Sequence, residues 1–154
     1  MNLITNIKPT QEHVLFSDMT TDARLQLRGK CDPETIAEYR RVFQEQDGQF
    51  EGKRPVVVRE RDNGRTVNWL ADGYHRREAG IEEDAKSILC DVYEGGFALA
   101  RLLAASANQS HGKQRDATTL HACIAAFHED EAWRTKGVRE IGRAVGCRHM
   151  TVQR

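Results

Sequence analysis

Three potential cations crowd into the short stretch NWLADGYHRREAG, residues 68–80. An apolar segment that reads as a buried strand stops at Asp72 and Gly73. The cationic side chains follow at once: His75, Arg76 and Arg77. The start of a helix favours negative charge, because its free amide groups carry partial positive charge. The placement of these cations therefore needs a physical reason.

A bound anion supplies such a reason. Glycine lets the backbone approach a ligand closely, the amides at a helix start attract phosphate, and guanidinium groups match phosphate oxygens. The alternative is a solvated helix face, on which Glu78 offsets part of the repulsion. The pattern favours a phosphate site formed by Gly73, His75, Arg76 and Arg77.

A second polar cluster, ANQSHGKQRD at 107–116, separates two apolar helical segments. Taken alone, it is typical of an exposed loop between helices. Taken with the first cluster, it predicts the other wall of an anion pocket. The side chains expected to reach the anion are Asn108, His111, Lys113 and Arg115.

The first cluster is expected on a small mixed β-sheet with helices. Asp32 and Pro33 are a typical N-cap and first helical residue, and Asp62-Asn63-Gly64 is typical of a hairpin turn. The elements predicted before residue 95 are a helix at 33–47, strands at 55–58 and 66–71 joined by that turn, a helix at 74–80 ended by Gly80, and a strand at 87–93.

After Gly96 the apolar spacing predicts only helices. They fall within 99–106, 120–127 and 138–145, and a last one starts at His149. That last helix has fewer than two turns before the sequence ends, so we expect a fragment, or a domain cut from a longer protein. The predicted fold class is α/β, with an α/β domain at 1–95 and a helical region at 96–154.

The composition predicts a packed core and a polar surface, because the 154 residues are 39% hydrophobic and 30% charged. No apolar run reaches the ~20 residues of a membrane helix, and the amino terminus lacks a signal-peptide pattern. We therefore expect a cytoplasmic protein with no membrane partner. Four widely spaced cysteines argue against a zinc site or a disulfide framework and predict reduced, half-buried thiols: Cys31, Cys90, Cys123 and Cys147.

The carboxyl end is basic although the formal net charge is zero. From Trp133 to Arg154, six basic residues stand against one acidic residue, a charge of +5 that leaves −5 on the rest. The helices at 138–145 and from His149 have helix-turn-helix spacing, with Gly142 small enough to let them cross. The alternative is a basic tail packed on the body. The expected DNA contacts are Arg139, Arg143, Arg148, His149, Thr151, Gln153 and Arg154.

The order of these motifs resembles the ParB/sulfiredoxin superfamily. LADGYHRREA looks like its arginine-containing signature, QLR at 26–28 sits where the family has Q-x-R, and RPVVVRE looks like its P-x-x-V strand. ANQSHG is similar to the E-N-x-x-R segment, and IGRAVGCRHMTV to the helix-turn-helix. The resemblance covers residues 24–154 and implies a ParB/sulfiredoxin-like fold of a divergent N-x-x-H-G branch.

This resemblance implies that a nucleoside triphosphate, CTP in the best-known branch, binds between the two polar clusters. Arg76 falls on the last arginine of the motif and is the first expected phosphate contact, while His75 replaces another arginine. Asn108 matches the motif asparagine, and His111 replaces its arginine. Ala107 replaces the metal-binding glutamate, so the resemblance leaves Mg²⁺ without the carboxylate it prefers and leaves hydrolysis open.

The implied function is nucleotide-dependent binding of double-stranded DNA in plasmid or chromosome partition or in transcription regulation, as a homodimer. The competing class is an enzyme on the same scaffold, a ParB-like nuclease or a nucleotide-dependent phosphotransferase, with Asp72, His75 and His111 near the phosphates. No carboxylate cluster near either motif forms a metal-ligand set, and the catalytic residues of such an enzyme stay open. An interaction module with an empty pocket is the third class. Tyr74 excludes sulfiredoxin chemistry, because that reaction needs a cysteine in this turn.

Overall fold

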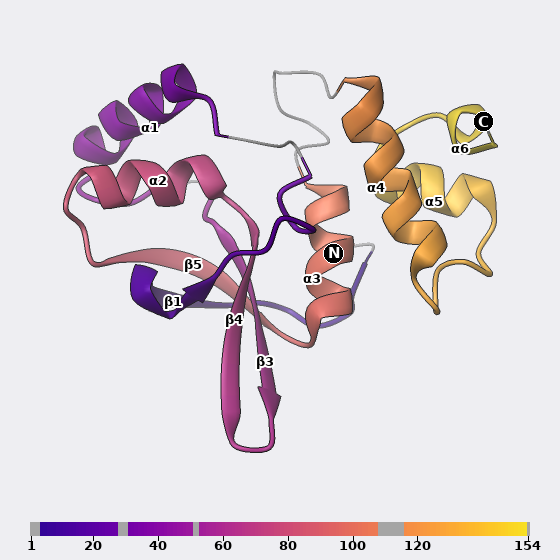
Figure 1. Cartoon of the computed structure of the whole chain (residues 1–154), viewed down its shortest axis with the longest axis horizontal. Coiled ribbons are helices and arrows are strands. Elements are labelled where there is room, and N and C mark those ends of the chain that lie inside the picture. The colour runs from indigo at the N-terminus through magenta and orange to yellow at the C-terminus, as the bar shows by residue number, and fades with distance from the viewer. Residues whose placement is uncertain (1–3, 28–30, 51–52, 108–115, 154) are drawn as a thin grey trace.

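The structure, a computed structural model, describes residues 4–27, 31–50, 53–107 and 116–153 (Figure 1). A single 3-10 turn at Phe16–Asp18 follows the first strand. The strands and helices are β1 (Thr10–Leu15), β2 (Met19–Thr20), α1 (Pro33–Glu45), β3 (Val56–Asp62), β4 (Arg65–Asp72), α2 (Tyr74–Glu82), β5 (Ser87–Glu94), α3 (Phe97–Ser106), α4 (Ala117–Glu129), α5 (Val138–Val145) and α6 (His149–Gln153).

The structure confirms the predictions that rested on strong local sequence signals. The Asp32 side chain accepts a hydrogen bond from the Glu34 amide, and Pro33 is the first residue of α1. Asn63 and Gly64 form the two-residue turn between β3 and β4, both with positive φ, as the favoured hairpin turn requires. Helix α5 has the predicted bounds, and α6 begins at the predicted residue.

The sheet is mixed, as predicted, and its five strands lie in the order β1-β5-β3-β4-β2. β1 pairs antiparallel with β5, β5 parallel with β3, β3 antiparallel with β4, and β4 parallel with β2. The two edge strands were not predicted. β1 buries only Val14, so its sequence lacks an apolar run, and β2 has only two residues.

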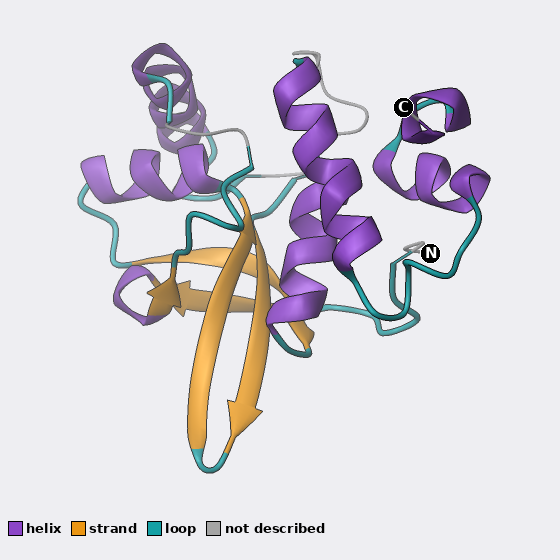
Figure 2. Ribbon diagram, turned by 45° about the vertical axis from the view of Figure 1, so that its right-hand side comes forward, coloured by secondary structure: helices purple, strands orange, loops and turns teal. Residues whose placement is uncertain are grey.

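Helices cover both faces of the sheet (Figure 2). Side chains alternate along each strand, so Val57 and Leu70 face α1, where they join Phe43 in one buried cluster. Val58 faces the other way and packs with Leu103 of α3. The candidate turn at Gly73 connects β4, in the middle of these layers, to α2.

The helices after α3 form their own buried cluster, which includes Phe127 and Ile141. Leu102 and Ala105 of α3 belong to this cluster, although Leu103 of the same helix packs on the sheet. The predicted domain boundary at 95/96 thus precedes a helix that contributes to both cores, and it stays a prediction. Among the described residues, no helix has the length and apolar character needed to span a membrane.

The prediction that Gly80 ends the second helix is wrong. Helix α2 continues to Glu82, and Gly80 is buried inside it. A Cβ at this position would lie 2.5 Å from Cζ of Phe16. The glycine allows α2 to approach the 3-10 turn after β1 closely, a tertiary requirement that the local sequence does not reveal.

None of the four cysteines, all within the described residues, forms a disulfide, but they differ in exposure: Cys90 and Cys123 are buried, and Cys31 and Cys147 are half-buried. Burial raises the pKa of Cys90 to about 12, with the nearby Asp91 carboxylate adding to the shift.

We predict that a thiol-specific disulfide reagent near neutral pH labels Cys31 and Cys147 of the native protein but spares Cys90 and Cys123, because the thiolate is the reacting form and needs access. Mass spectrometry of labelled peptides identifies the sites. Unfolding in guanidinium should make all four react. Rapid labelling of Cys90 in the native protein would contradict the packing described for β5.

Candidate functional site

The turn at Gly73 has a conformation that only glycine adopts without strain. Its φ is 107°, and a Cβ would lie 2.8 Å from Cβ and 3.0 Å from Cα of Pro55. No side chain caps the start of α2, and its first turn holds no acidic residue. The amide end of α2 therefore keeps its partial positive charge without a neighbouring carboxylate in that turn.

Arg76 points into the protein, with only 4% of its surface exposed. Its Nη1 donates to the Lys53 carbonyl oxygen at 2.5 Å, and its Nη2 donates to Oδ2 of Asp72 at 3.2 Å. This guanidinium links the segment before β3, the end of β4 and the first turn of α2. The residue expected to be the first phosphate contact thus already has two protein partners.

His75 connects the two helices on one face of the sheet. Its Nε2 accepts a hydrogen bond from the Asp32 amide at 3.0 Å, and its ring lies 6.4 Å from the ring of Tyr39 in α1. The His75 ring thereby links the N-cap of α1 to the first turn of α2.

Arg77 lies at the surface of the turn, with its side chain 22% exposed, and its Nη1 forms an ion pair with Oε1 of Glu78 at 2.5 Å. Its Nε is buried and has no hydrogen-bond partner in the described part of the chain. A buried donor without a partner costs free energy. Of the three cations, Arg77 therefore has the clearest unmet hydrogen-bonding capacity.

Tyr74, the first residue of α2, contacts a segment that the sequence did not connect with this turn. Its hydroxyl lies 3.1 Å from the Leu70 carbonyl oxygen and 3.3 Å from that of Asp22. Burial raises the pKa of Tyr74, so the hydroxyl keeps its proton. The Asp22 carboxylate accepts two hydrogen bonds from the Arg24 side chain, which lower its pKa to about 2. No local sequence signal predicts this long-range contact.

The second predicted wall, with Asn108, His111, Lys113 and Arg115, lies outside the described residues. Ala107, the position of the family glutamate, is the C-cap of α3, and its amide donates to the Ala104 carbonyl oxygen at 3.4 Å. In the described ranges, no group of three or more His, Cys, Asp or Glu side chains is arranged to hold a metal ion.

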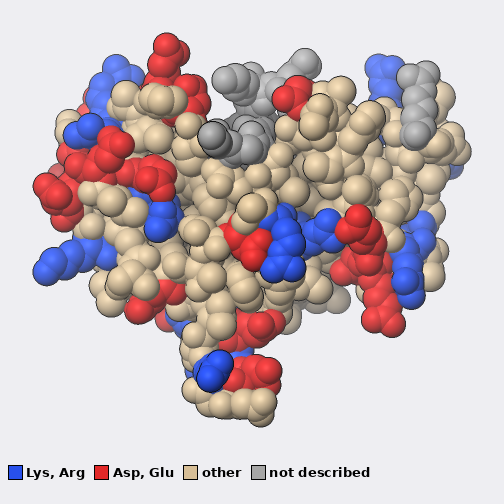
Figure 3. Space-filling model, in the orientation of Figure 1, with Lys and Arg blue, Asp and Glu red and all other residues tan. Residues whose placement is uncertain are grey.

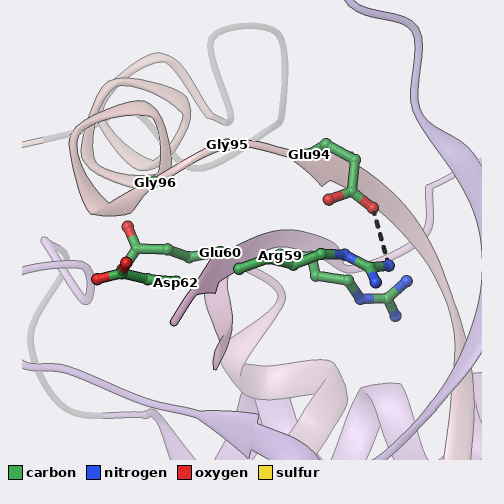
Figure 4. Close-up of a pocket in the computed structure, with 7 residues that line it drawn as sticks. Arg59, Glu60, Asp62, Glu94, Gly95 and Gly96 are labelled. Carbon is green, nitrogen blue, oxygen red and sulfur yellow. Dashed lines mark hydrogen bonds and ion pairs between the residues drawn. The ribbon is translucent and has the colours of Figure 1, made fainter. Parts of the chain in front are cut away.

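An open hollow of about 500 Å³ lies elsewhere, between the hairpin end of β3 and the connection from β5 to α3 (Figure 4). Several of its charged groups have protein partners: Glu60 accepts from the Phe97 amide at 3.0 Å, and Arg61 pairs with Glu94 at 3.4 Å. Because β3 and β4 run antiparallel, this hollow lies at the opposite end of β3 from Gly73. It includes no predicted site residue.

At the basic end, Gly142 permits the close contact that the sequence predicted between α5 and the next helix. A Cβ there would lie 3.0 Å from the Cys147 carbonyl oxygen and 3.4 Å from Cα of His149. Gly146 ends α5 with a φ of 82°, and Val152 of α6 packs into the helical cluster. Two short helices thus meet through a tight turn at 146–148.

Most of the predicted DNA contacts are exposed on these two helices. Thr151 is half-buried, and Arg154 lies outside the described residues. Figure 3 shows acidic side chains close to the basic ones on the face that it presents, and Lys136 forms an ion pair with Glu140 at 3.7 Å. The exposed predicted contacts are Arg139, Arg143, Arg148, His149 and Gln153.

The mixed sheet and its covering helices define a ParB/sulfiredoxin-like fold. Three solved structures similar to this chain contain ParB domains. A Pnob8-like ParB-N domain has a TM-score of 0.65 at 13% identity, and the similarity covers 92% of this chain and 62% of that one. The present chain thus spans less than two thirds of that domain structure.

The other two structures are of C-terminally truncated ParB, a chromosome-partitioning protein, from Caulobacter crescentus. The complex with the centromeric parS site has a TM-score of 0.59 at 10% identity, covering 92% of this chain and 68% of that one. The complex with CTP-γ-S has a TM-score of 0.51 at 10% identity, covering 93% and 74%. No family model and no curated protein matches this chain.

We predict that Arg76→Ala lowers the free energy of unfolding by about 3 kcal/mol, because it leaves the Asp72 carboxylate, 12% exposed, without its ion-pair partner. Arg77→Ala should cost about 1 kcal/mol or less, since the pair that it removes is near the surface. Urea denaturation measures both changes. Equal losses from the two variants would contradict the structural role of Arg76.

Proposed function

We propose that this chain is a ParB-like protein that binds a nucleoside triphosphate and double-stranded DNA, and that it acts in plasmid or chromosome partition or in transcription regulation. The ParB/sulfiredoxin-like fold supports this proposal. The observation that carries it is Arg77, whose partly buried guanidinium has a donor without a partner beside the uncapped start of α2.

The phosphates bind at the first turn of α2, where backbone amides and the helix dipole favour an anion. Gly73, buried against Pro55, sets the left-handed backbone from which α2 begins, and Arg77 turns from Glu78 toward the phosphate. Arg76 supports the phosphate site indirectly, because its hydrogen bonds to Asp72 and to the Lys53 carbonyl oxygen hold the turn in its conformation. The main role of His75 is to link the turn to α1, through the hydrogen bond that it accepts from the Asp32 amide.

In this proposal, the segment 108–115 supplies the other wall of the site. Its asparagine, histidine, lysine and arginine complement the phosphate charge with hydrogen-bond donors. CTP is the first nucleotide to test, because the Caulobacter ParB was crystallised with CTP-γ-S. Ala107 supplies no carboxylate for Mg²⁺, so binding does not depend on the metal through this position. The proposed contacts of this wall are Asn108, His111, Lys113 and Arg115.

DNA binds the basic end through a helix-turn-helix formed by α5 and α6. The second helix enters the major groove, and residues at its start reach base edges. A homodimer presents two such helices to a site with two-fold symmetry. The proposed contacts are Arg139, Arg143, Arg148, His149, Thr151, Gln153 and Arg154.

We predict that CTP raises the melting temperature of the protein, because only a ligand that prefers the folded state does so. CTP, ATP, GTP and UTP are compared with and without Mg²⁺, and calorimetry gives each dissociation constant. Arg77→Ala should weaken binding by about tenfold, since a charge-assisted hydrogen bond is lost. Arg65→Ala, an exposed change on the distant hairpin, is the matched control. Unchanged affinity in Arg77→Ala would remove this residue from the site.

We predict that DNA affinity falls steeply with salt concentration, because bound phosphates release counterions. A double variant, Arg143→Ala with Arg148→Ala, should lower the slope of log K against log salt by about 2. Fluorescence anisotropy with a labelled duplex selected from a random pool measures the slope. Arg41→Ala on α1 controls for net charge. A slope unchanged in the double variant would rule out these contacts.

A further inference from the structure

The segment Asp22–Leu27, here called the strap, runs from the candidate phosphate turn to the helical region. At its start, the hydroxyl of Tyr74 lies 3.3 Å from the Asp22 carbonyl oxygen and 3.4 Å from the Asp22 amide nitrogen. The same carbonyl accepts hydrogen bonds from the amides of Leu25 and Gln26, at 2.9 and 3.3 Å. Tyr74 thus contacts the same carbonyl group whose hydrogen bonds to Leu25 and Gln26 hold the strap in its conformation.

The middle of the strap is fixed against α3 and the sheet. Leu25 is only 2% exposed and packs in the cluster formed by the sheet and α3. The Arg24 guanidinium lies 4.1 Å from the ring centre of Phe97, the first residue of α3. The Phe97 ring lies 4.9 Å from the Trp69 ring of β4. The strap therefore cannot shift without disturbing the start of α3.

The end of the strap reaches the second core. Leu27 packs against the helical cluster that contains residues of α3, α4, α5 and α6. Within six residues, the chain contacts the first residue of α2, the first residue of α3 and the core that supports α5. It is a direct physical connection between the candidate phosphate turn and the candidate DNA-binding helices.

The hydroxyl of Tyr74 can occupy two hydrogen-bonding states. It has one proton, and two carbonyl oxygens are within reach, Leu70 of β4 at 3.1 Å and Asp22 of the strap at 3.3 Å. Donation to Leu70 leaves the strap with the weaker contact, in which the hydroxyl accepts from the Asp22 amide. Tyr74 directly follows Gly73 in the sequence. An anion bound to the first-turn amides of α2 therefore acts on the residue whose hydroxyl changes between these two hydrogen-bonding states.

We propose that Tyr74 is a positioning residue that couples phosphate binding at the Gly73 turn to the strap and, through Leu27, to the helical region. This inference rests on the proposed nucleotide site. Tyr74 does not contact the phosphate. A bound phosphate shifts the start of α2, moves the hydroxyl proton between Leu70 and Asp22, and changes how firmly the strap holds the helical cluster.

The test compares the full chain with Tyr74→Phe, which removes only the hydroxyl. CTP, ATP, GTP and UTP are tested in turn for binding by calorimetry, and amide hydrogen exchange is measured with and without the nucleotide that binds. In the wild-type chain, the nucleotide should change exchange at Leu25 and Gln26, and in α4 and α5, by about fivefold. Tyr74→Phe should bind within about twofold of wild type and lose these changes.

Two variants control the result. Tyr39→Phe deletes a hydroxyl away from the strap and should respond as the wild type does. Leu27→Ala keeps the contact between Tyr74 and Asp22 but weakens the far end of the strap. It should keep the exchange response at Leu25 and Gln26 and lose the response in α4 and α5. A purely structural role for Tyr74 does not produce this separation.

The remaining outcomes distinguish this inference from the proposed function. If Tyr74→Phe binds nucleotide and transmits the exchange changes as the wild type does, the positioning role is wrong and the nucleotide site stands. If Tyr74→Phe loses affinity by more than about tenfold, Tyr74 belongs to the binding site and the positioning role is again wrong. If the wild-type chain binds none of the four nucleotides, both proposals fail.

Discussion

The buried ion pair between Arg76 and Asp72 is the constraint on which the candidate site depends. Moving two charges out of water costs several kcal/mol for each ion, and close partners with further hydrogen bonds must compensate. Arg76 meets this requirement with a second bond to the Lys53 carbonyl oxygen. The pair thereby fixes the end of β4, the segment before β3 and the first turn of α2 relative to one another. Gly73 lies between the paired residues and presses against Pro55, so the geometry of the turn is set from both sides.

This constraint also explains why adjacent cations in the sequence are separate in space. Consecutive residues on an α-helix point about 100° apart, so the three side chains of the turn leave α2 in different directions. Arg76 enters the protein, His75 turns to the start of α1, and Arg77 stays near the surface beside Glu78. The like charges therefore repel each other less than their spacing in the sequence implies. Under the proposed function, a ligand would mainly engage Arg77 and the backbone amides.

The sequence predicted the parts of the fold that depend on local interactions. The helix cap at Asp32 and the hairpin turn at Asn63 are determined by neighbouring residues, and both were found from their residue types. The two edge strands, the buried Gly80 and the contact between Tyr74 and Asp22 depend on partners far away in the chain. The residue types at Gly73 were recognised as unusual, but only the structure showed that Arg76 is buried.

Helix α3 contributes buried side chains to two hydrophobic cores, the one it forms with the sheet and the one it forms with the later helices. Ala100 and Leu103 pack toward the sheet, while Leu102 and Ala105 pack toward α4 and α5. A buried helix transmits displacement as a rigid unit, since closely packed cores have little free volume. Movement of α3 relative to the sheet must therefore be matched in the helical cluster. The strap contacts the first residue of this helix through Arg24 and Phe97, so the strap and α3 together connect the candidate phosphate turn with the basic end.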